Sequence, residues 1–353
     1  MTRLLLLLSP SSNRVYAGTA PGVVAAELQV LAEGRLGAPV RSVEPVRVAG
    51  VDYLAVELDA PDEPTGGEGY GATYAALGQL SAAHALFRRV GDDLLAPVGL
   101  PRTERLDDDL LTIPKYPGRT NEQFTRALLN VTLAATSWGD QVGRRPFTVL
   151  DPLAGRGTTL SWALALGHDA YGVELERREV EAYAAFLTTW LRRKRLKHSI
   201  GLNPLRRNGR QVAELLEAFL HPDAEAWKAG QRQHLSLFAA DTLRTAELLG
   251  RRKVEAVVTD APYGVAHGSR AGGGGRDRSP ADLLAEAVPV WASVLRSGGA
   301  MGIAWNTHGL AREDLAAIVT GAGLVVRDEG PWTRLAHRVD AGIHRDVLVA
   351  HQP

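Results

Sequence analysis

The stretch FTVLDPLAGRGTTL, residues 147–160, joins a short apolar strand that ends in an acid to a helix, through two glycines. Gly155 and Gly157 let the backbone turn tightly and approach a ligand closely. The helix that follows presents its first N–H groups at the same place. The pattern is not the GxGxxG dinucleotide fingerprint, and no GKS or GKT follows it, so a P-loop is disfavoured. It predicts the first strand and the ligand-binding loop of a parallel α/β sheet.

From residue 111 onward, short apolar strands alternate with helical segments, which predicts a parallel sheet with helices on both faces. Ligands bind beyond the carboxyl ends of the strands in such sheets. Four of the predicted strands end in an acid: Asp151, Glu174, Asp241 and Asp260. A single acid there is often a helix cap, but four at one edge predict a binding site. Glu174 is placed to accept hydrogen bonds from ribose hydroxyls, and Asp241 to meet an adenine edge.

The chain of 353 residues predicts two domains. Residues 1–105 read as a small α+β domain, residues 111–353 as the α/β domain, and PRTERLDDD as the linker between them. The apolar run Leu4–Leu8 is shorter than the roughly 7–15 residues of a signal-peptide core. It predicts a buried first strand, in a chain without a membrane anchor.

Composition excludes some chemistry. Hydrophobic residues make up 45% and charged residues 23%, as in ordinary globular proteins. Cysteine is absent, which excludes disulfides, thiolate metal sites and cysteine nucleophiles, and fits a reducing cytoplasm. The ten histidines show no metal-ligand spacing. We therefore expect a cytoplasmic protein that needs no metal.

Basic residues are concentrated in one segment although the net charge is +0. A basic insertion at about residues 192–232 begins as the continuation of a helix and continues as a loop. Phosphate contacts are its natural use, and a solvated helix face is the alternative. The glycine-rich segment 268–278 follows the last acidic motif and reads either as a loop that orders over substrate or as a disordered surface loop. The candidate nucleic-acid contacts are Arg192, Arg193, Lys194, Arg195, Arg270 and Arg345.

The motifs DPLAGRGTT, GVELE, AAD and DAPYG, in this order, resemble those of class I S-adenosylmethionine-dependent methyltransferases. The upstream segment KYPGRTNEQFTRALLNVTL, the acid followed by PYG, and the late strand AGIHRDVLVA resemble tRNA guanine-N2 methyltransferases, the group that usually carries THUMP domains. No THUMP module is recognised. The resemblance implies a Rossmann-like, seven-stranded class I fold over 111–353. It also implies a preceding ferredoxin-like α+β domain over 1–105 that docks RNA.

The same resemblance implies S-adenosyl-L-methionine as the cofactor and RNA, first of all tRNA, as the partner; whether a partner protein subunit takes part is left open. The implied cofactor-binding residues are Asp151, Gly155, Gly157, Thr158, Glu174, Asp241, Thr120 and Phe124.

In TDAPYG, residues 259–264, the resemblance implies that the Asp260 carboxylate and the Ala261 carbonyl accept the two N–H bonds of an exocyclic amine. These acceptors concentrate the nitrogen lone pair and stabilise the charge that develops on nitrogen. Pro262 keeps residue 261 extended, so alanine in place of proline leaves a working site. Tyr263 is implied to stack on the base. A strand-end turn with a packed Pro-Tyr is the alternative interpretation of this stretch.

Other functions stay open. A DNA methyltransferase acting on adenine N6 or cytosine N4 fits the motif order, but such enzymes usually carry a target-recognition domain, and this chain ends as the fold closes. A protein or small-molecule N-methyltransferase would make the basic segment incidental. An RNA chaperone with an inactive site is disfavoured by Asp260 and Tyr263.

Overall fold

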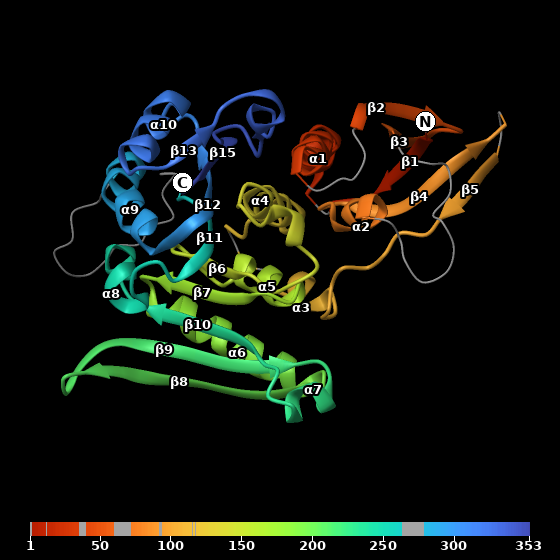
Figure 1. The fold of residues 1–353 in the computed structure, drawn as a ribbon. Helices are drawn as coiled ribbons and strands as arrows, with labels where there is room; N and C mark the ends of the chain where they lie inside the picture. Colours follow the sequence, from red (N-terminus) through yellow and green to blue (C-terminus); the bar gives the residue numbers. More distant parts are fainter. Residues whose placement is uncertain are drawn as a thin grey trace.

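The computed structural model describes residues 2–11, 13–34, 40–59, 72–91, 94–114, 116, 118–262 and 279–353. Tyr263, Arg270 and the glycine-rich segment 268–278 lie outside the described residues. The rest forms two sheets, each with its own helices (Figure 1).

The N-terminal sheet is antiparallel, with the strand order β2-β3-β1-β4-β5. Its strands are β1 Thr2–Leu8, β2 Val40–Val48, β3 Val51–Leu58, β4 Ala83–Val90 and β5 Leu94–Val98. The helices of this part are α1 Arg14–Gly34 and α2 Ala72–Gln79. Leucines of β1 and β3 form a core with apolar residues of both helices. The predicted strand at Leu4–Leu8 and the predicted α+β character of this region are confirmed.

The C-terminal sheet is mixed, and its strand path is β13-β15-β12-β11-β6-β7-β10-β9-β8, with β14 pairing on β15. Its strands are β6 Thr148–Asp151, β7 Asp169–Glu174, β8 Lys197–Arg207, β9 Arg210–His221, β10 Gln233–Ala239, β11 Val254–Asp260, β12 Leu295–Asn306, β13 Val325–Arg327, β14 His337–Arg338 and β15 His344–His351. The remaining α-helices are α3 Asp109–Thr112, α4 Glu122–Ala134, α5 Thr158–Ala165, α6 Arg177–Arg193, α7 Ala224–Lys228, α8 Thr245–Leu249, α9 Pro280–Val294 and α10 Arg312–Gly321. Three short 3-10 helices are η1 Gly139–Gln141, η2 Thr242–Arg244 and η3 Gly330–Thr333.

Five parallel strands set the position of the site. β6 is followed by β7 and β10 on one side and by β11 and β12 on the other. The strand order therefore reverses between β6 and β11, and ligands of doubly wound sheets bind at such a switch point. The predicted Rossmann-like sheet is confirmed, and it places Asp151 and Asp260 on neighbouring strands at the reversal.

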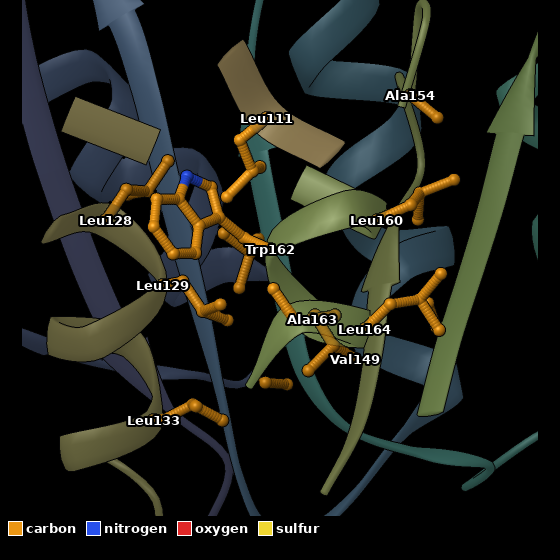
Figure 2. Packing of buried hydrophobic residues seen from close by; sticks show 14 of the residues in the cluster. Leu111, Leu128, Leu129, Leu133, Val149, Ala154, Leu160, Trp162, Ala163 and Leu164 are labelled. Atoms are coloured by element: carbon orange, nitrogen blue, oxygen red, sulfur yellow. The ribbon is translucent and has the colours of Figure 1, made fainter. Parts of the chain in front are cut away.

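Helices cover both faces of this sheet, as predicted. Alternate residues of β6 face opposite ways: Val149 packs in the core under α4, α5 and α6, whereas Leu150 packs with α9 and α10. Figure 2 shows Trp162 of α5 lying against Leu128 and Leu129 of α4. The Trp162 indole N–H donates to the Glu122 carbonyl at 2.7 Å. This bond ties the start of α4 to the helix that follows the glycine loop.

The basic insertion differs from its prediction. Its start continues α6 to Arg193, as predicted, but Lys197–His221 forms a β-hairpin, β8 and β9, which extends the sheet beyond β10. The sheet therefore has ten strands in the described chain, not seven. The turn is Asn208-Gly209, with φ of 50° and 77°, and Asn-Gly between two strand-like runs is a strong hairpin signal. The hairpin could therefore have been predicted from the Asn-Gly dipeptide in the sequence.

Helix α1 joins the two parts of the molecule. Within the described chain, Arg14–Glu33 is the segment long and apolar enough to cross a membrane by length and composition alone, although half of it is buried. Its Glu27 is fully buried and accepts hydrogen bonds from Ser81 N, Ser81 Oγ and Asn130 Nδ2. Because α1 packs on α4 and carries this polar network, it is a core helix.

Burial raises the pKa of Glu27, although its hydrogen bonds act in the opposite direction. The folded state therefore holds the proton to a higher pH than the unfolded state does. The resulting stabilisation is present below the unfolded pKa and is lost as pH rises through the folded pKa. We predict that Glu27→Gln flattens the fall of melting temperature as pH rises above the ordinary pKa of a glutamate, measured by calorimetry. Glu33→Gln, on the exposed part of the same helix, is the control. Parallel curves for Glu27→Gln and the parent protein would contradict this account.

Candidate functional site

The glycine loop leaves β6 at Asp151, which is buried. Asp151 Oδ1 accepts from Leu153 N at 3.1 Å and from Thr259 Oγ1 at 3.0 Å, so this carboxylate links the loop to β11. Burial raises the pKa of Asp151 to about 6. Asp151 is one of the predicted cofactor contacts. In the structure it lies beneath the glycine loop, and its hydrogen bonds fix the shape of that loop.

The two glycines have different structural reasons. Both have positive φ, 50° at Gly155 and 74° at Gly157. A Cβ on Gly157 would lie 2.8 Å from the Tyr183 ring, whereas a Cβ on Gly155 would meet no atom within 4 Å. Gly157 is therefore required by packing against α6. Gly155 faces open space, where a ligand can approach the backbone.

Glu174 closes the loop from the end of β7. Its Oε2 accepts from Gly155 N and its Oε1 from Glu176 N, each at 2.8 Å. The side chain is partly buried, and burial raises its pKa. The next residue, Leu175, is 66% exposed at the same edge. A carboxylate beside an exposed apolar side chain suits the ribose and the flat base of a nucleoside. Sequence reasoning missed Leu175.

Asp260 ends β11 and is held from two directions. Thr120 Oγ1 donates to Asp260 Oδ2 at 2.6 Å, and Arg345 Nη2 donates to the same oxygen at 3.2 Å. Ala261 is buried, and its N–H bonds to the Ala304 carbonyl at 2.8 Å, which continues the β11–β12 ladder. These contacts fix the acid and the residue after it at the switch point, and Pro262 follows at the surface.

Three residues with different predicted roles surround Asp260. Arg345, predicted to contact RNA, has a 3% exposed side chain and forms an ion pair with Asp260. Phe124, predicted at the cofactor, is buried with its ring 4.4 Å from the Arg345 guanidinium. Thr120, also predicted at the cofactor, donates to Asp260. Thr120 and Arg345 contact Asp260 directly, and Phe124 packs on Arg345, so the three hold Asp260 in place and not the glycine loop. The reason is that α4 begins beside β11 and β15.

The other cofactor candidates flank the loop. Thr158 begins α5, and its hydroxyl lies 3.3 Å from the Tyr116 hydroxyl. A small pocket next to it is lined by Pro114, Tyr116, Arg156, Ala182, Tyr183 and Phe186. Asp241 follows β10 and caps η2 by accepting from Leu243 N at 2.9 Å. Within the described residues, no group of three His, Asp or Glu side chains could hold a metal ion.

The basic residues lie at both ends of the strands, some at the carboxyl ends, where Asp260 lies, and some at the amino ends. Lys194 binds Asp107 and Asp109 at 2.8 and 2.7 Å, so its charge serves the linker. Arg192, Arg193 and Arg195 are exposed at the end of α6, which spans 17 residues from the edge that holds Glu174. They therefore lie about 25 Å from that edge. The hairpin turn, with exposed Arg206 and Arg210, lies on the same edge as Asp260, because β9 runs antiparallel to β10.

A second pocket lies on the other side of Arg345. Its lining comes from the starts of α1 and α4 and from β14 and β15: Asn13, Tyr16, Arg119, Asn121, His337, Arg338, Val339 and Arg345. Sequence reasoning missed this pocket because its residues are far apart in the chain and form no motif.

No family model matches the sequence, and no curated protein matches it. Solved structures that resemble the chain include TrmN from Thermus thermophilus, at 13% identity and a TM-score of 0.45, covering 99% of both chains. A TehB-like SAM-dependent methyltransferase from Corynebacterium glutamicum has 13% identity and a TM-score of 0.32, covering 59% of this chain and 82% of its own. The 1,6-didemethyltoxoflavin-N1-methyltransferase of Burkholderia thailandensis, solved with S-adenosylhomocysteine, has 18% identity and a TM-score of 0.34, covering 65% and 79%. With TM-scores this low, fold and function rest on the strand order and the site geometry.

The two glycines provide a matched pair of variants. Gly155→Ala adds a methyl group in open space and should cost about 1 kcal/mol from its positive φ alone. Gly157→Ala adds the contact with Tyr183 as well and should cost about 2–3 kcal/mol. Urea unfolding measures both. Equal losses would show that Tyr183 does not restrict the loop.

Proposed function

We propose that this chain is an S-adenosylmethionine-dependent methyltransferase that acts on an exocyclic amino group of a nucleobase in RNA. The observation that carries the proposal is the pairing of two features at one switch point. A glycine loop closed by Glu174 lies on β6 and β7, and Asp260 is held in place at the end of adjacent β11. The first feature suits a nucleoside cofactor, and the second suits an acceptor amine.

The residues present fit S-adenosylmethionine. Gly155 leaves space at the backbone, Glu174 offers carboxylate oxygens for ribose hydroxyls, and exposed Leu175 offers apolar surface for a base. Asp241 and Thr158 border the same edge. When bound, the cofactor supplies a methyl group that is already activated by its sulfonium.

The task left to the protein is to prepare the amine. Asp260 accepts one N–H of the exocyclic amine, and the Ala261 carbonyl accepts the other. The nitrogen lone pair then points away from the ring toward the methyl group, and the carboxylate stabilises the positive charge that develops on nitrogen. Arg345 and Thr120 keep Asp260 oriented, since both donate to Oδ2. The surplus proton on nitrogen passes to Asp260 or to water.

The finer proposal is guanine N2 in tRNA. The N-terminal part supports it through its β-α-β-β-α-β element order, which is that of a ferredoxin-like domain, followed by β5. We propose that this domain docks RNA, because α1 and α4 bring it against the support of Asp260. A DNA methyltransferase acting on adenine N6 or cytosine N4 is the rival. Cytoplasmic location and independence of metal belong to the same proposal.

Asp260 tests the chemistry. Removing its carboxylate should lower methyl transfer at least about a hundredfold. It also removes an ion-pair partner of the buried Arg345 side chain, so Asp260→Ala should lose stability. Asp260→Asn retains an accepting oxygen and should keep more activity than Asp260→Ala. Rates on tRNA are measured by nucleoside mass spectrometry for N2-methylguanosine, with calorimetry of cofactor binding as the control. Transfer by Asp260→Ala at the parent rate would exclude this role.

Variants of the basic residues test which end of the sheet binds RNA. If RNA lies over the carboxyl ends of the parallel strands, the double variant Arg206→Glu, Arg210→Glu should weaken RNA binding. The slope of log affinity against log salt should fall by about one for each phosphate that the protein no longer neutralises. Arg192→Glu with Arg193→Glu changes the same charge at the opposite edge and should have the smaller effect. A larger loss of affinity from the second pair would place the RNA across the far edge.

A further inference from the structure

The pocket beyond Arg345 combines a positive field with buried, unpartnered polar atoms. Its eight described lining residues include three arginines and no acid. Together with the solvent at its mouth, it has a volume of about 290 Å³. Arg345 lies in its wall and donates to Asp260, so the pocket begins one side chain away from the proposed catalytic acid.

The donors of this pocket favour an anion. Arg338 donates through Nε to the Asp340 carbonyl at 2.9 Å, and Arg119 contacts Glu122 at 3.6 Å and the Leu111 carbonyl. A guanidinium has five N–H donors, so each retains donors for a ligand. The N-termini of α1 and α4 both open here, capped by Asn13 and Asn121. Their positive dipole ends add to the attraction for negative charge.

His337 supplies an acceptor to the same pocket. Its side chain is 4% exposed, and its Nδ1 lies 3.0 Å from the Leu335 carbonyl. A carbonyl can only accept, so Nδ1 carries the hydrogen. Burial lowers the pKa of His337 to about 4, so the ring is neutral and Nε2 is an acceptor. Within the described part of the chain, Nε2 has no hydrogen-bond partner.

Tyr16 supplies a donor from the N-terminal domain. It is 3% exposed, and its hydroxyl bonds to none of the described residues. Burial raises its pKa, so it keeps its proton. Its ring meets the His337 ring edge-on, with centroids 5.5 Å apart. Phe124 supports His337 from another direction at 4.7 Å. The packing of these rings holds both polar atoms in position, although neither has a hydrogen-bond partner among the residues that the structure describes.

We propose that this pocket binds the ribose-phosphate of the nucleotide next to the target base, with His337 Nε2 accepting the ribose 2′-hydroxyl. The phosphate lies among Arg338, Arg119 and the Tyr16 hydroxyl. A ligand that carries an anionic group next to a hydroxyl donor satisfies both halves of the pocket, whereas a phosphate alone leaves His337 unsatisfied. The 2′-hydroxyl distinguishes RNA from DNA. The proposal rests on the proposed function and adds to it a determinant of RNA specificity.

The test uses a short single-stranded RNA of mixed sequence and a DNA of the same sequence, with affinities measured by fluorescence anisotropy on the full chain. The parent protein should prefer RNA. His337→Phe keeps the ring packing and removes Nε2. It should lower RNA affinity about fivefold to tenfold, the scale of one hydrogen bond, and leave DNA affinity unchanged. His337→Gln restores an accepting oxygen and should recover part of the preference.

The phosphate half of the pocket has its own matched pair. Arg338→Gln should weaken RNA and DNA binding alike. Arg334→Gln alters an exposed arginine that also donates to a backbone carbonyl but does not line the pocket, so it should weaken neither. If Arg338→Gln and Arg334→Gln bind alike, the anion site is wrong.

Three further outcomes would overturn the proposal. The parent protein could bind RNA and DNA equally. His337→Phe could weaken S-adenosylmethionine binding in calorimetry, which would assign the pocket to the cofactor. Guanosine monophosphate could bind and resist displacement by excess RNA, which would assign it to a free nucleotide. None of these measurements requires methyl transfer. Failure of the proposed reaction would show itself separately, as absence of cofactor heat or of methylated product.

Discussion

The carboxylate of Asp260 is the point at which three separate parts of the chain meet. It ends β11 at the reversal of strand order, and it accepts from Thr120 just before α4 and from Arg345 on β15. Removing this acid would take an ion-pair partner from the buried Arg345 side chain, and breaking a buried ion pair is strongly destabilising. The position of α4 and the closing strand therefore depends on the same group that the proposed chemistry uses. Stability and function are coupled at this residue.

The N-terminal domain is coupled to that point through α4. Glu27 of α1 bonds Asn130 within α4, and Trp332 of η3 donates to Glu33 of α1 at 2.8 Å. Tyr16 and Phe124 then meet His337 between the two parts. Glu27 accepts from Ser81 and Asn130 at the same junction, and buried hydrogen bonds of this kind specify one arrangement of the two parts. The domain is thus joined to the support of the site rather than attached by the linker alone.

The sequence allowed prediction of what depends on local pattern. Apolar strands ending in acids located β6, β7, β10 and β11, and the glycines located the loop, because each feature is a run of neighbouring residues. The hairpin was missed although Asn208-Gly209 signalled it, since the dense basic charge around it suggested a solvated face. The surroundings of Asp260 could not be predicted, because Thr120 and Arg345 are 140 and 85 residues away. Contacts between residues this far apart in the chain produce no periodic pattern or fixed spacing from which they could be predicted.

The carboxylates at the ends of the strands are of two kinds, which differ in their hydrogen-bond partners. Asp151 and Glu174 accept from backbone N–H groups of the glycine loop and its flanks, and burial raises the pKa of both. Asp260 instead accepts from a cation and a hydroxyl. Backbone amides fix the shape of a loop, and an arginine and a threonine fix the direction of a single carboxylate. The carboxyl ends of the strands therefore divide into a half where acids hold the glycine loop and a half where Asp260 is paired with Arg345. Arg345, which belongs to both the acid and the neighbouring pocket, extends that second half toward the N-terminal domain.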